Sequence, residues 1–275
     1  MPLRVSLFGC GTIGTEVARA FADGTINADL TRIYDRNAEK RQSVVDEFPV
    51  DDAPKPVDDF TDLFEGVDLV VEAAGQSAVA DVAVPSLESG CDVLLLSAGA
   101  LAASELRQQV VRTAEKEGQV VHVPSGAIAG LDAVKAAALT GDLETVSLTT
   151  TKNPSGLEGA PYLVENDIDL SALDSATTVF EGPATEAALA FPSNINVAMA
   201  LSLAGIGPDE TTVRIVADPE ESNNVHHIEA TGGMGSIETT VRNVPSPTNP
   251  KTSYLAAVSA IEKLRTMGAT VRVGT

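Results

Sequence analysis

Three glycines near the start of the chain constrain its fold more than any other feature. Residues 9–14, Gly-Cys-Gly-Thr-Ile-Gly, follow a short apolar run at 4–8 and precede a stretch with helical spacing of apolar residues. A strand that turns into a helix through G-x-G-x-x-G is typical of a phosphate-binding turn for a dinucleotide. Gly9 permits the tight turn, Gly11 lets the backbone approach a pyrophosphate, and Gly14 lets the helix pack on the strand. The predicted cofactor contacts of this turn are Gly9, Gly11, Thr12, Ile13 and Gly14.

Strand and helix patterns alternate through the first 125 residues. Further strands are expected at 30–34, 68–74, 92–97 and 119–123, and helices at 15–23, 38–47, 77–89 and 103–116, with a loop at 50–59. The strand segments are continuous apolar runs, which are typical of a parallel sheet covered on both faces. The sequence therefore predicts an α/β chain whose residues 1–125 form a doubly wound parallel sheet, a Rossmann domain.

The pattern changes after about residue 125. Strands that alternate polar and apolar residues are expected at 144–151, 211–218, 225–231 and 236–241, the last two joined by a glycine-rich turn, and helices at 131–139, 194–204 and 254–266. Alternation indicates a sheet with one solvated face. We expect a smaller α+β second domain at 126–250. Residues 251–275 are expected to form a C-terminal helix that packs back on the first domain.

Asp35 bears on the choice of dinucleotide. It ends the second strand, 21 residues beyond Gly14, where a carboxylate can bind both ribose hydroxyls. A carboxylate there repels a 2′-phosphate, so Asp35 favours NAD. Arg36 follows at once, and Arg32 and Arg41 are close in sequence; an arginine can pair with a 2′-phosphate. The prediction is NAD, with NADP as the alternative that Arg36 would support.

The charge of the chain limits its partners. Asp and Glu number 39 and Lys and Arg 18, which gives a formal net charge of −21. Such a field disfavours nucleic acid and anionic membranes. No apolar run approaches the ~18 residues of a membrane span, and the first residues do not resemble a signal peptide, so a cytoplasmic protein is expected. An acidic, lysine-poor chain also suggests a salt-loving source, since the Debye length is only about 3 Å at 1 M salt. The alternative is an acidic protein of ordinary salinity.

Three histidines are the candidates for proton transfer, because their unperturbed pKa lies near neutrality. His122 lies within the fifth apolar strand, where a packed residue is the simpler interpretation. His226 shares a strand face with Ile228, whereas His227 lies on the other face and is expected to be solvated. His226 is therefore the better catalytic candidate, with an ordinary edge-strand histidine as the alternative.

Other candidates are weaker. Asn194 and Asn196 open a helix, where they either cap it or contact a ligand. The small residues at 125–130 follow the fifth strand, at the sheet edge where ligands bind in this fold. Lys152 and Asn153 end an alternating strand and are candidates for a substrate carboxylate. The two cysteines, Cys10 and Cys91, lack metal-ligand spacing and are expected to be buried and reduced, so no metal site is predicted.

Beyond these features, the sequence resembles the L-aspartate dehydrogenase family. The segments that carry the resemblance appear in family order at 7–14, 70–74, 124–131, 191–203, 216–219, 223–227 and 245–260. The resemblance implies NAD(P)-dependent oxidative deamination of L-aspartate to iminoaspartate, which hydrolyses to oxaloacetate and ammonia. It also implies a homodimer and a role in NAD biosynthesis.

The resemblance also implies roles for individual residues. The family's active-site histidine falls on His226, and its cofactor-contacting asparagine falls on Asn196. Ala129 is the other implied cofactor contact. The chain departs from the family at Val225, where an arginine is frequent, and in having a second histidine at His227. The alternatives are another dehydrogenase or reductase on this scaffold, of homoserine or dihydrodipicolinate type, and a dinucleotide sensor without chemistry.

Overall fold

The computed structural model of the chain describes residues 2–246 and 249–274. Residues 247 and 248, within the segment 245–260 that carries part of the resemblance, lie outside the described residues. The chain divides into two compact units. The first runs to Pro124 and includes Ala257–Val273, and the second covers Ser125–Ala256.

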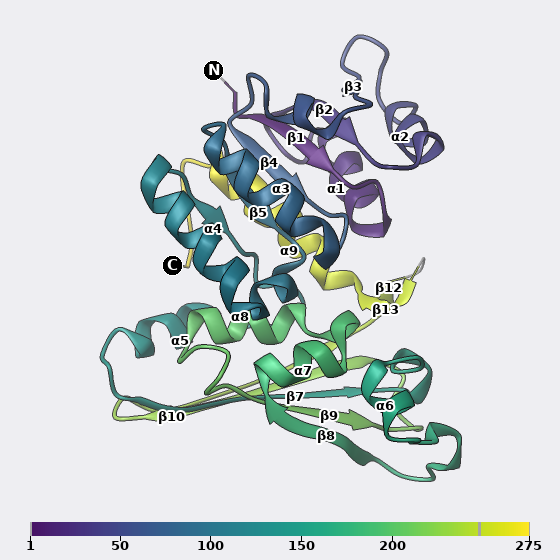
Figure 1. The fold of residues 1–275 in the computed structure, drawn as a ribbon, viewed down its shortest axis with the longest axis vertical. Coiled ribbons are helices and arrows are strands. Elements are labelled where there is room, and N and C mark those ends of the chain that lie inside the picture. The colour runs from purple at the N-terminus through teal and green to yellow at the C-terminus, as the bar shows by residue number, and fades with distance from the viewer. Residues whose placement is uncertain (1, 247–248, 275) are drawn as a thin grey trace. The chain divides into compact units, whose positions relative to one another are not determined.

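A six-stranded parallel sheet forms the centre of the first unit (Figure 1). Its strands are β1 (Arg4–Phe8), β2 (Asp29–Tyr34), β3 (Lys55–Pro56), β4 (Leu69–Glu72), β5 (Asp92–Leu95) and β6 (Val121–His122), in the order β3-β2-β1-β4-β5-β6. The helices are α1 (Thr12–Ala22), α2 (Ala38–Val45), α3 (Gln76–Glu88), α4 (Ser104–Glu117) and α9 (Tyr254–Met267). The chain order reverses between β1 and β4, and ligands bind at the carboxyl ends of the strands at such a switch point. The predicted Rossmann domain is confirmed.

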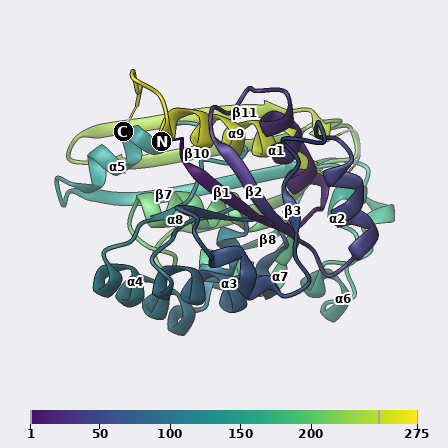
Figure 2. The ribbon, with the colours of Figure 1, turned by 90° about the horizontal axis from the view of Figure 1, so that it is seen from above.

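Helices cover both faces of this sheet (Figure 2). On one face, Leu7 of β1 packs in a cluster with Val17 of α1 and with Ala260 and Leu264 of α9. On the other face, Val70 of β4 belongs to a second cluster that includes Val82 of α3. Each fully buried aliphatic side chain contributes roughly 1.5–3 kcal/mol relative to its exposed state. The two apolar layers explain why the strands are continuous apolar runs.

Two elements of the first unit differ from the expectation. The stretch 50–59 was expected to be a loop, yet Lys55 and Pro56 form β3, a two-residue edge strand parallel to β2. A proline is tolerated there because an edge strand needs hydrogen bonds on one side only. Helix α1 begins at Thr12, three residues before the expected start, because the glycine-rich turn itself supplies its first turn.

A five-stranded mixed sheet forms the second unit. Its strands are β7 (Leu143–Lys152), β8 (Thr177–Pro183), β9 (Thr212–Ala217), β10 (Asn224–Gly232) and β11 (Gly235–Asn243), in the order β11-β10-β7-β9-β8. All neighbours are antiparallel except β7 and β9. The helices are α5 (Leu131–Ala138), α6 (Pro161–Glu165), α7 (Ala184–Ala190) and α8 (Asn196–Ala204), and a small hairpin of β12 (Pro245–Ser246) and β13 (Asn249–Ser253) follows the sheet.

The two faces of this second sheet have different surroundings. On β7 the buried side chains recur at Val146, Leu148, Thr150 and Lys152. A Cβ on Gly205, after α8, would lie 3.2 Å from Val146 and 3.3 Å from a side-chain carbon of α5, so α5 and α8 pack on this face. Figure 1 shows α5, α7 and α8 of this unit along one face of its sheet. The predicted alternation is confirmed, and we call the helix-covered side the inner face.

Candidate active site

The glycine-rich turn between β1 and α1 is built as the motif requires. Gly9 has φ +108°, and a Cβ on it would lie 2.6 Å from the backbone of Ala73 and Ala74. A Cβ on Gly14 would lie 1.9 Å from the carbonyl oxygen of Gly9. Gly11 differs, because a Cβ there would meet nothing within 4 Å. Gly9 and Gly14 are therefore required by packing, whereas Gly11 faces open space.

The start of α1 fits a pyrophosphate. Gly11 is the N-cap, no side chain caps the helix, and no acidic residue lies in its first turn. The first backbone N–H groups of a helix lack partners within the helix and carry a partial positive charge. Thr12 and Ile13 supply such groups beside the open space at Gly11. The residues present thus fit the phosphates of a dinucleotide.

Asp35 is anchored beside this turn. Its Oδ2 accepts a hydrogen bond from the Cys10 amide at 2.8 Å, and its Oδ1 accepts one from the Asn37 amide at 2.9 Å. Each carboxylate oxygen retains a further lone pair, so the group can still accept from hydroxyls. The structure places Asp35 next to the turn, as its sequence spacing predicts.

The three arginines near Asp35 have different surroundings. Arg41 donates to the Asp35 carbonyl oxygen at 2.9 Å and pairs with Asp58. Arg32 donates to the carbonyl oxygen of Glu65. Arg36 is exposed and makes no hydrogen bond or ion pair with the described part of the chain. Of the three, Arg36 is the one whose guanidinium is available to a ligand.

In the second unit, His226 lies on the inner face and is 4% exposed. Its Nδ1 lies 3.0 Å from Oγ1 of Thr150, which is its register partner on β7. Burial, and secondarily the charge of Lys152, lowers the pKa of His226 to about 3. The ring is therefore neutral at ordinary pH. When Nδ1–H donates to Thr150, Nε2 carries the lone pair and can accept a proton.

Other polar side chains are buried in the same unit. Lys152 follows Thr150 on the inner face of β7 and is 4% exposed. Asn224 precedes His226 on β10 and donates to Oγ of Ser253 at 3.2 Å. Buried polar groups are costly unless they are hydrogen-bonded, so such a concentration indicates a site rather than a packed core. Sequence reasoning missed Thr150 and Asn224; their signal is a polar residue at the inward position of an alternating strand.

Strand β11 holds the segment 125–130 in place. Asn243 donates from Nδ2 to the Ala127 carbonyl oxygen at 3.0 Å, and Thr239 donates to the Ala129 carbonyl oxygen at 3.2 Å. Val241, which lies between these two residues of β11, is the register partner of His226. Ala129 is therefore hydrogen-bonded to β11, the strand that pairs with the His226 strand β10.

The start of α8 lies against the same segment. A Cβ on Gly126 would lie 3.4 Å from the side chain of Val197, which follows Asn196. Ile195 is the N-cap of α8, so side-chain capping by Asn194 is not observed. The Oδ1 atom of Asn194 is instead buried and has no hydrogen-bond partner among the described residues. Ala129, Asn196 and His226, the three positions implied by the resemblance in this half of the chain, all belong to the second unit.

The remaining candidates have other contacts. His227 points to the opposite face of β10, where its Nδ1 lies 2.8 Å from Oγ1 of Thr240. The face assignment of the two histidines is confirmed. His122 belongs to the first unit, where Asp92 lies 3.8 Å away and burial lowers its pKa. Asn153 donates to carbonyl oxygens of Pro219 and Glu221 and so fixes a loop.

Comparison with known proteins separates the two halves of the chain. The sequence model of the family described as "Homoserine dehydrogenase, NAD binding domain" matches residues 9–124. That of "Aspartate dehydrogenase, C-terminal" matches residues 132–267. The L-aspartate dehydrogenase of Methanococcoides burtonii is 45% identical over 273 residues, which cover 99% of this chain and 100% of that protein. The chain belongs to the L-aspartate dehydrogenase family.

Two further relatives agree with this membership. The L-aspartate dehydrogenase of Methanosarcina mazei is 44% identical over 274 residues, covering 99% of this chain and all of that protein. The crystal structure of aspartate dehydrogenase from Thermotoga maritima has a TM-score of 0.78 and 26% identity, with each chain covered completely. As a member of the L-aspartate dehydrogenase family, the chain is an oxidoreductase that uses a pyridine nucleotide. The described residues contain no helix that could span a membrane and no cluster of metal-binding side chains.

Proposed function

We propose that the chain is an L-aspartate dehydrogenase, which oxidises the CH–NH2 group of L-aspartate to iminoaspartate with NAD or NADP as acceptor. Hydrolysis of the imine then yields oxaloacetate and ammonia. The observation that carries the proposal is His226, a neutral buried histidine fixed by Thr150 in the unit that matches the family's C-terminal model. When bound, the dinucleotide supplies the hydride acceptor.

His226 acts as the proton acceptor in this proposal. The ammonium group of the substrate must lose a proton before its nitrogen lone pair can form the C=N bond as hydride leaves the α-carbon for the dinucleotide. Nε2 takes that proton and gives it up to solvent, and in the hydrolytic half the neutral ring takes a proton from the attacking water. Oγ1 of Thr150 lies 3.0 Å from Nδ1, and this contact fixes the ring orientation. In the tautomer whose Nδ1–H donates to Thr150, Nε2 is the proton acceptor. Positioned general bases contribute typically 10²–10⁴-fold to rate.

Lys152 is proposed to bind a carboxylate of the substrate. It lies on the same inner face as Thr150, two residues further along β7, and its charge lowers the pKa of His226. L-Aspartate brings two carboxylates into a protein of net charge −21, so a buried ammonium offsets repulsion where the substrate must bind. Burial, together with this charge, favours the neutral ring, which is the form in which Nε2 carries a lone pair.

Each unit by itself contains residues that are proposed as cofactor contacts. In the first, these are Gly9, Gly11, Thr12, Ile13, Gly14, Asp35 and Arg36. In the second, Ala129 and Asn196 contact the nicotinamide half, and the buried Oδ1 of Asn194 offers an acceptor for a ligand N–H. Small residues at 125–130 let a flat ring lie against the backbone.

The proposal is tested by following the absorbance of NADH with L-aspartate and NAD at alkaline pH, and in reverse with oxaloacetate and ammonia. We expect turnover in both directions that is confined to aspartate among amino acids. Turnover with homoserine instead would indicate the other dehydrogenase class. Dinucleotide binding without turnover on any of these substrates would indicate a sensor. Either result would contradict the proposal.

NAD is expected to be preferred over NADP. The Asp35 carboxylate is fixed beside the glycine-rich turn, where it repels a 2′-phosphate, whereas the exposed Arg36 is held by no hydrogen bond or ion pair with the described residues. We expect kcat/KM with NAD to exceed that with NADP by about tenfold or more. Asp35→Ser should lower the ratio of kcat/KM with NAD to kcat/KM with NADP, and Arg36→Ala should raise this ratio. Equal use of NADP by the wild-type enzyme would show that Arg36 dominates.

Further attributes are also proposals. The chain is proposed to be a cytoplasmic homodimer that supplies iminoaspartate for NAD biosynthesis, as the family resemblance implies. Its acidic, lysine-poor composition supports adaptation to high salt, because self-repulsion at net charge −21 is screened in molar KCl. Light scattering measures the oligomeric state, and an unfolding series in KCl measures how stability depends on salt. A monomer, or full stability in dilute buffer, would contradict the respective proposal.

A further inference from the structure

Glu72 is a carboxylate with no exposed surface at the end of β4. Charged side chains are almost never buried completely unless they are paired or hydrogen-bonded. The other residues of β4 are apolar, so packing of the sheet does not explain a carboxylate at this position. Its position is at the carboxyl end of β4, next to β1, where the order of the strands reverses.

Donor groups from the segments after β4 and β5 surround the Glu72 carboxylate. Its Oε1 accepts from the amides of Ala74 and Gly75 and from Oγ of Ser97, each at 2.9 Å. Its Oε2 accepts from the Ser97 amide at 3.0 Å. Burial raises the pKa of Glu72, and these hydrogen bonds oppose that effect. Three of the donors are backbone N–H groups, which can only donate, so the arrangement is built for an acceptor.

The hydrogen bonds connect Glu72 to the glycine-rich turn. A Cβ on Gly9 would lie only 2.6 Å from the backbone of Ala73 and Ala74, so this segment and the turn are in direct contact. The Ala73 amide also donates to the carbonyl oxygen of Phe8, the residue before Gly9. Any displacement of Ala73–Gly75 therefore moves or releases the turn that faces the phosphates.

The same carboxylate organises a second segment. Ser97 follows β5 and is the N-cap of the short 3-10 helix at Ala98–Ala102. The carbonyl oxygen of Glu72 accepts from the Leu96 amide at 3.1 Å, so both ends of the residue hold the chain that leaves β5. One side chain thus fixes the loops after two neighbouring strands, and both loops lie at the edge where ligands bind in this fold.

We propose that Glu72 is a positioning residue for the dinucleotide, which fixes the loops after β4 and β5 against the glycine-rich turn. This inference rests on the proposed use of a pyridine nucleotide but not on the identity of the amino-acid substrate. A residue that served only stability would affect unfolding without changing affinity for the dinucleotide. The two roles are therefore separated by measuring binding and unfolding in the same variants.

The test variant is Glu72→Gln, which keeps the shape but places an NH2 group where an oxygen now accepts. At least one backbone N–H then loses its acceptor in a buried place, and loss of a hydrogen bond to a charged group corresponds to about 10–100-fold in an equilibrium constant. We expect the Kd for NADH, measured by fluorescence without substrate, to rise by about that factor. Ser97→Ala removes the hydroxyl donor and keeps the backbone donors, so it is expected to raise the Kd less.

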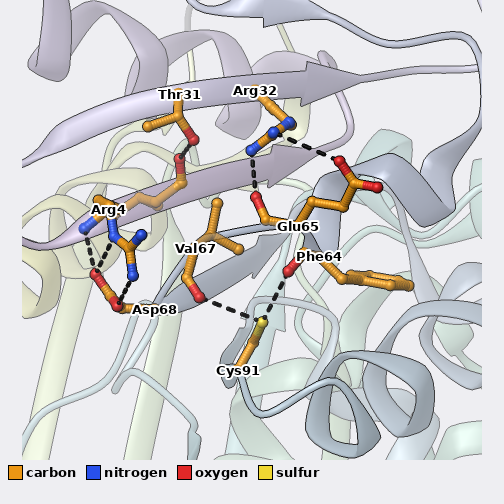
Figure 3. Close-up of polar contacts among 9 residues, drawn as sticks. Arg4, Thr31, Arg32, Phe64, Glu65, Val67, Asp68 and Cys91 are labelled. Carbon is orange, nitrogen blue, oxygen red and sulfur yellow. Dashed lines mark hydrogen bonds and ion pairs between the residues drawn. The ribbon is translucent and has the colours of Figure 1, made fainter.

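Asp68→Asn is the matched control. Asp68 precedes the same strand, at its opposite end, and its carboxylate accepts from the Arg4 amide at 2.8 Å and from the Arg4 guanidinium at 2.7 Å (Figure 3). The variant also loses a strand-end carboxylate that binds a backbone amide, but this one lies away from the glycine-rich turn. Its Kd for NADH is expected to stay within about twofold of the wild type, whatever its melting temperature.

An unchanged Kd for NADH in Glu72→Gln would overturn the proposal, even if the variant unfolds at a lower temperature. If that variant does not fold, the proposal is tested by the Kd of Ser97→Ala and by hydrogen exchange in the wild type. NADH is expected to slow hydrogen exchange at the amides of Ala74, Gly75 and Ser97. Unchanged exchange at all three amides under saturating NADH would equally overturn the proposal. Absence of aspartate turnover, with these binding effects present, would contradict the proposed substrate alone.

Discussion

Replacing His226 with alanine is expected to lower kcat by about 10²–10⁴-fold, the usual contribution of a positioned general base. The Kd for NADH should stay within about twofold, because His226 is not among the residues proposed to contact the dinucleotide. His226 sits on the inner face of β10 with Thr150 on its Nδ1. Steady-state rates with L-aspartate, together with NADH fluorescence titrations, check both parts.

His227→Ala is the control for this experiment. The neighbouring histidine lies on the opposite face of β10 and contacts Thr240, so its loss should change kcat by less than about threefold. A near-normal rate in His226→Ala, combined with a large loss of rate in His227→Ala, would assign the catalytic role to His227. It would also show that the face assignment does not decide function.

The lowered pKa of His226 adds a dependence on pH. Its folded-state pKa of about 3 lies below the ordinary value of 6.5, so the neutral ring is favoured in the folded protein. As pH falls below 6.5, the unfolded chain binds a proton that the folded chain does not, and stability is lost progressively toward pH 3. Replacing His226 should remove this part of the acid sensitivity, measured as the difference in unfolding free energy between the two proteins in molar KCl.

Alanine at Gly11 and at Gly14 should give opposite results. In Gly14→Ala the new Cβ would lie 1.9 Å from the Gly9 carbonyl oxygen, so the backbone must shift and the free energy of unfolding should fall by roughly 3 kcal/mol or more. In Gly11→Ala the methyl group meets nothing within 4 Å and φ is −78°, so stability should change by only about 1 kcal/mol. The methyl group nevertheless occupies the space expected for the pyrophosphate.

The Kd for NADH separates these two variants. Gly11→Ala should raise it by about 10–100-fold in a folded protein, since a close backbone approach to the phosphates is lost. Chemical unfolding and NADH titration on both variants provide the data. A stable Gly14→Ala protein would contradict the packing role, and wild-type affinity in Gly11→Ala would mean that no phosphate binds at this turn.

The fold was largely predictable because its signals are local. The glycine turn, the apolar runs of the first unit and the alternation on β7 and β10 each appear within ten to twenty residues. The elements that escaped prediction include β3, β8 (Thr177–Pro183), α6 (Pro161–Glu165), α7 (Ala184–Ala190) and the hairpin of β12 and β13. β3 has two residues and contains a proline, and Gly182-Pro183 at the junction of β8 and α7 hides both a strand end and a helix start. The strands that pair with β3 and β8 are β2 and β9, which lie outside the local sequence, so no local pattern predicts these two strands.

The site was predictable only in part, for a different reason. His226 and Asp35 follow from spacing and strand phase. Glu72 does not, because it ends an apolar strand and resembles a solvated strand terminus until the Ala74, Gly75 and Ser97 donors are seen around it. A buried charge depends on contacts from several loops, and those contacts exist only once the chain has folded.

The placement of α9 has a consequence for how the protein is made. Its Ala260 and Leu264 complete the apolar layer beside β1 and α1, yet they follow the whole of the second unit along the chain. Domains generally fold as units while synthesis proceeds. The second unit, continuous from Ser125 to Ala256, is available for folding before the first can close its core. The first unit therefore lacks part of one apolar layer until residues 257–267 are available, and a chain that ends before them leaves uncovered the apolar side chains that pack with Ala260 and Leu264.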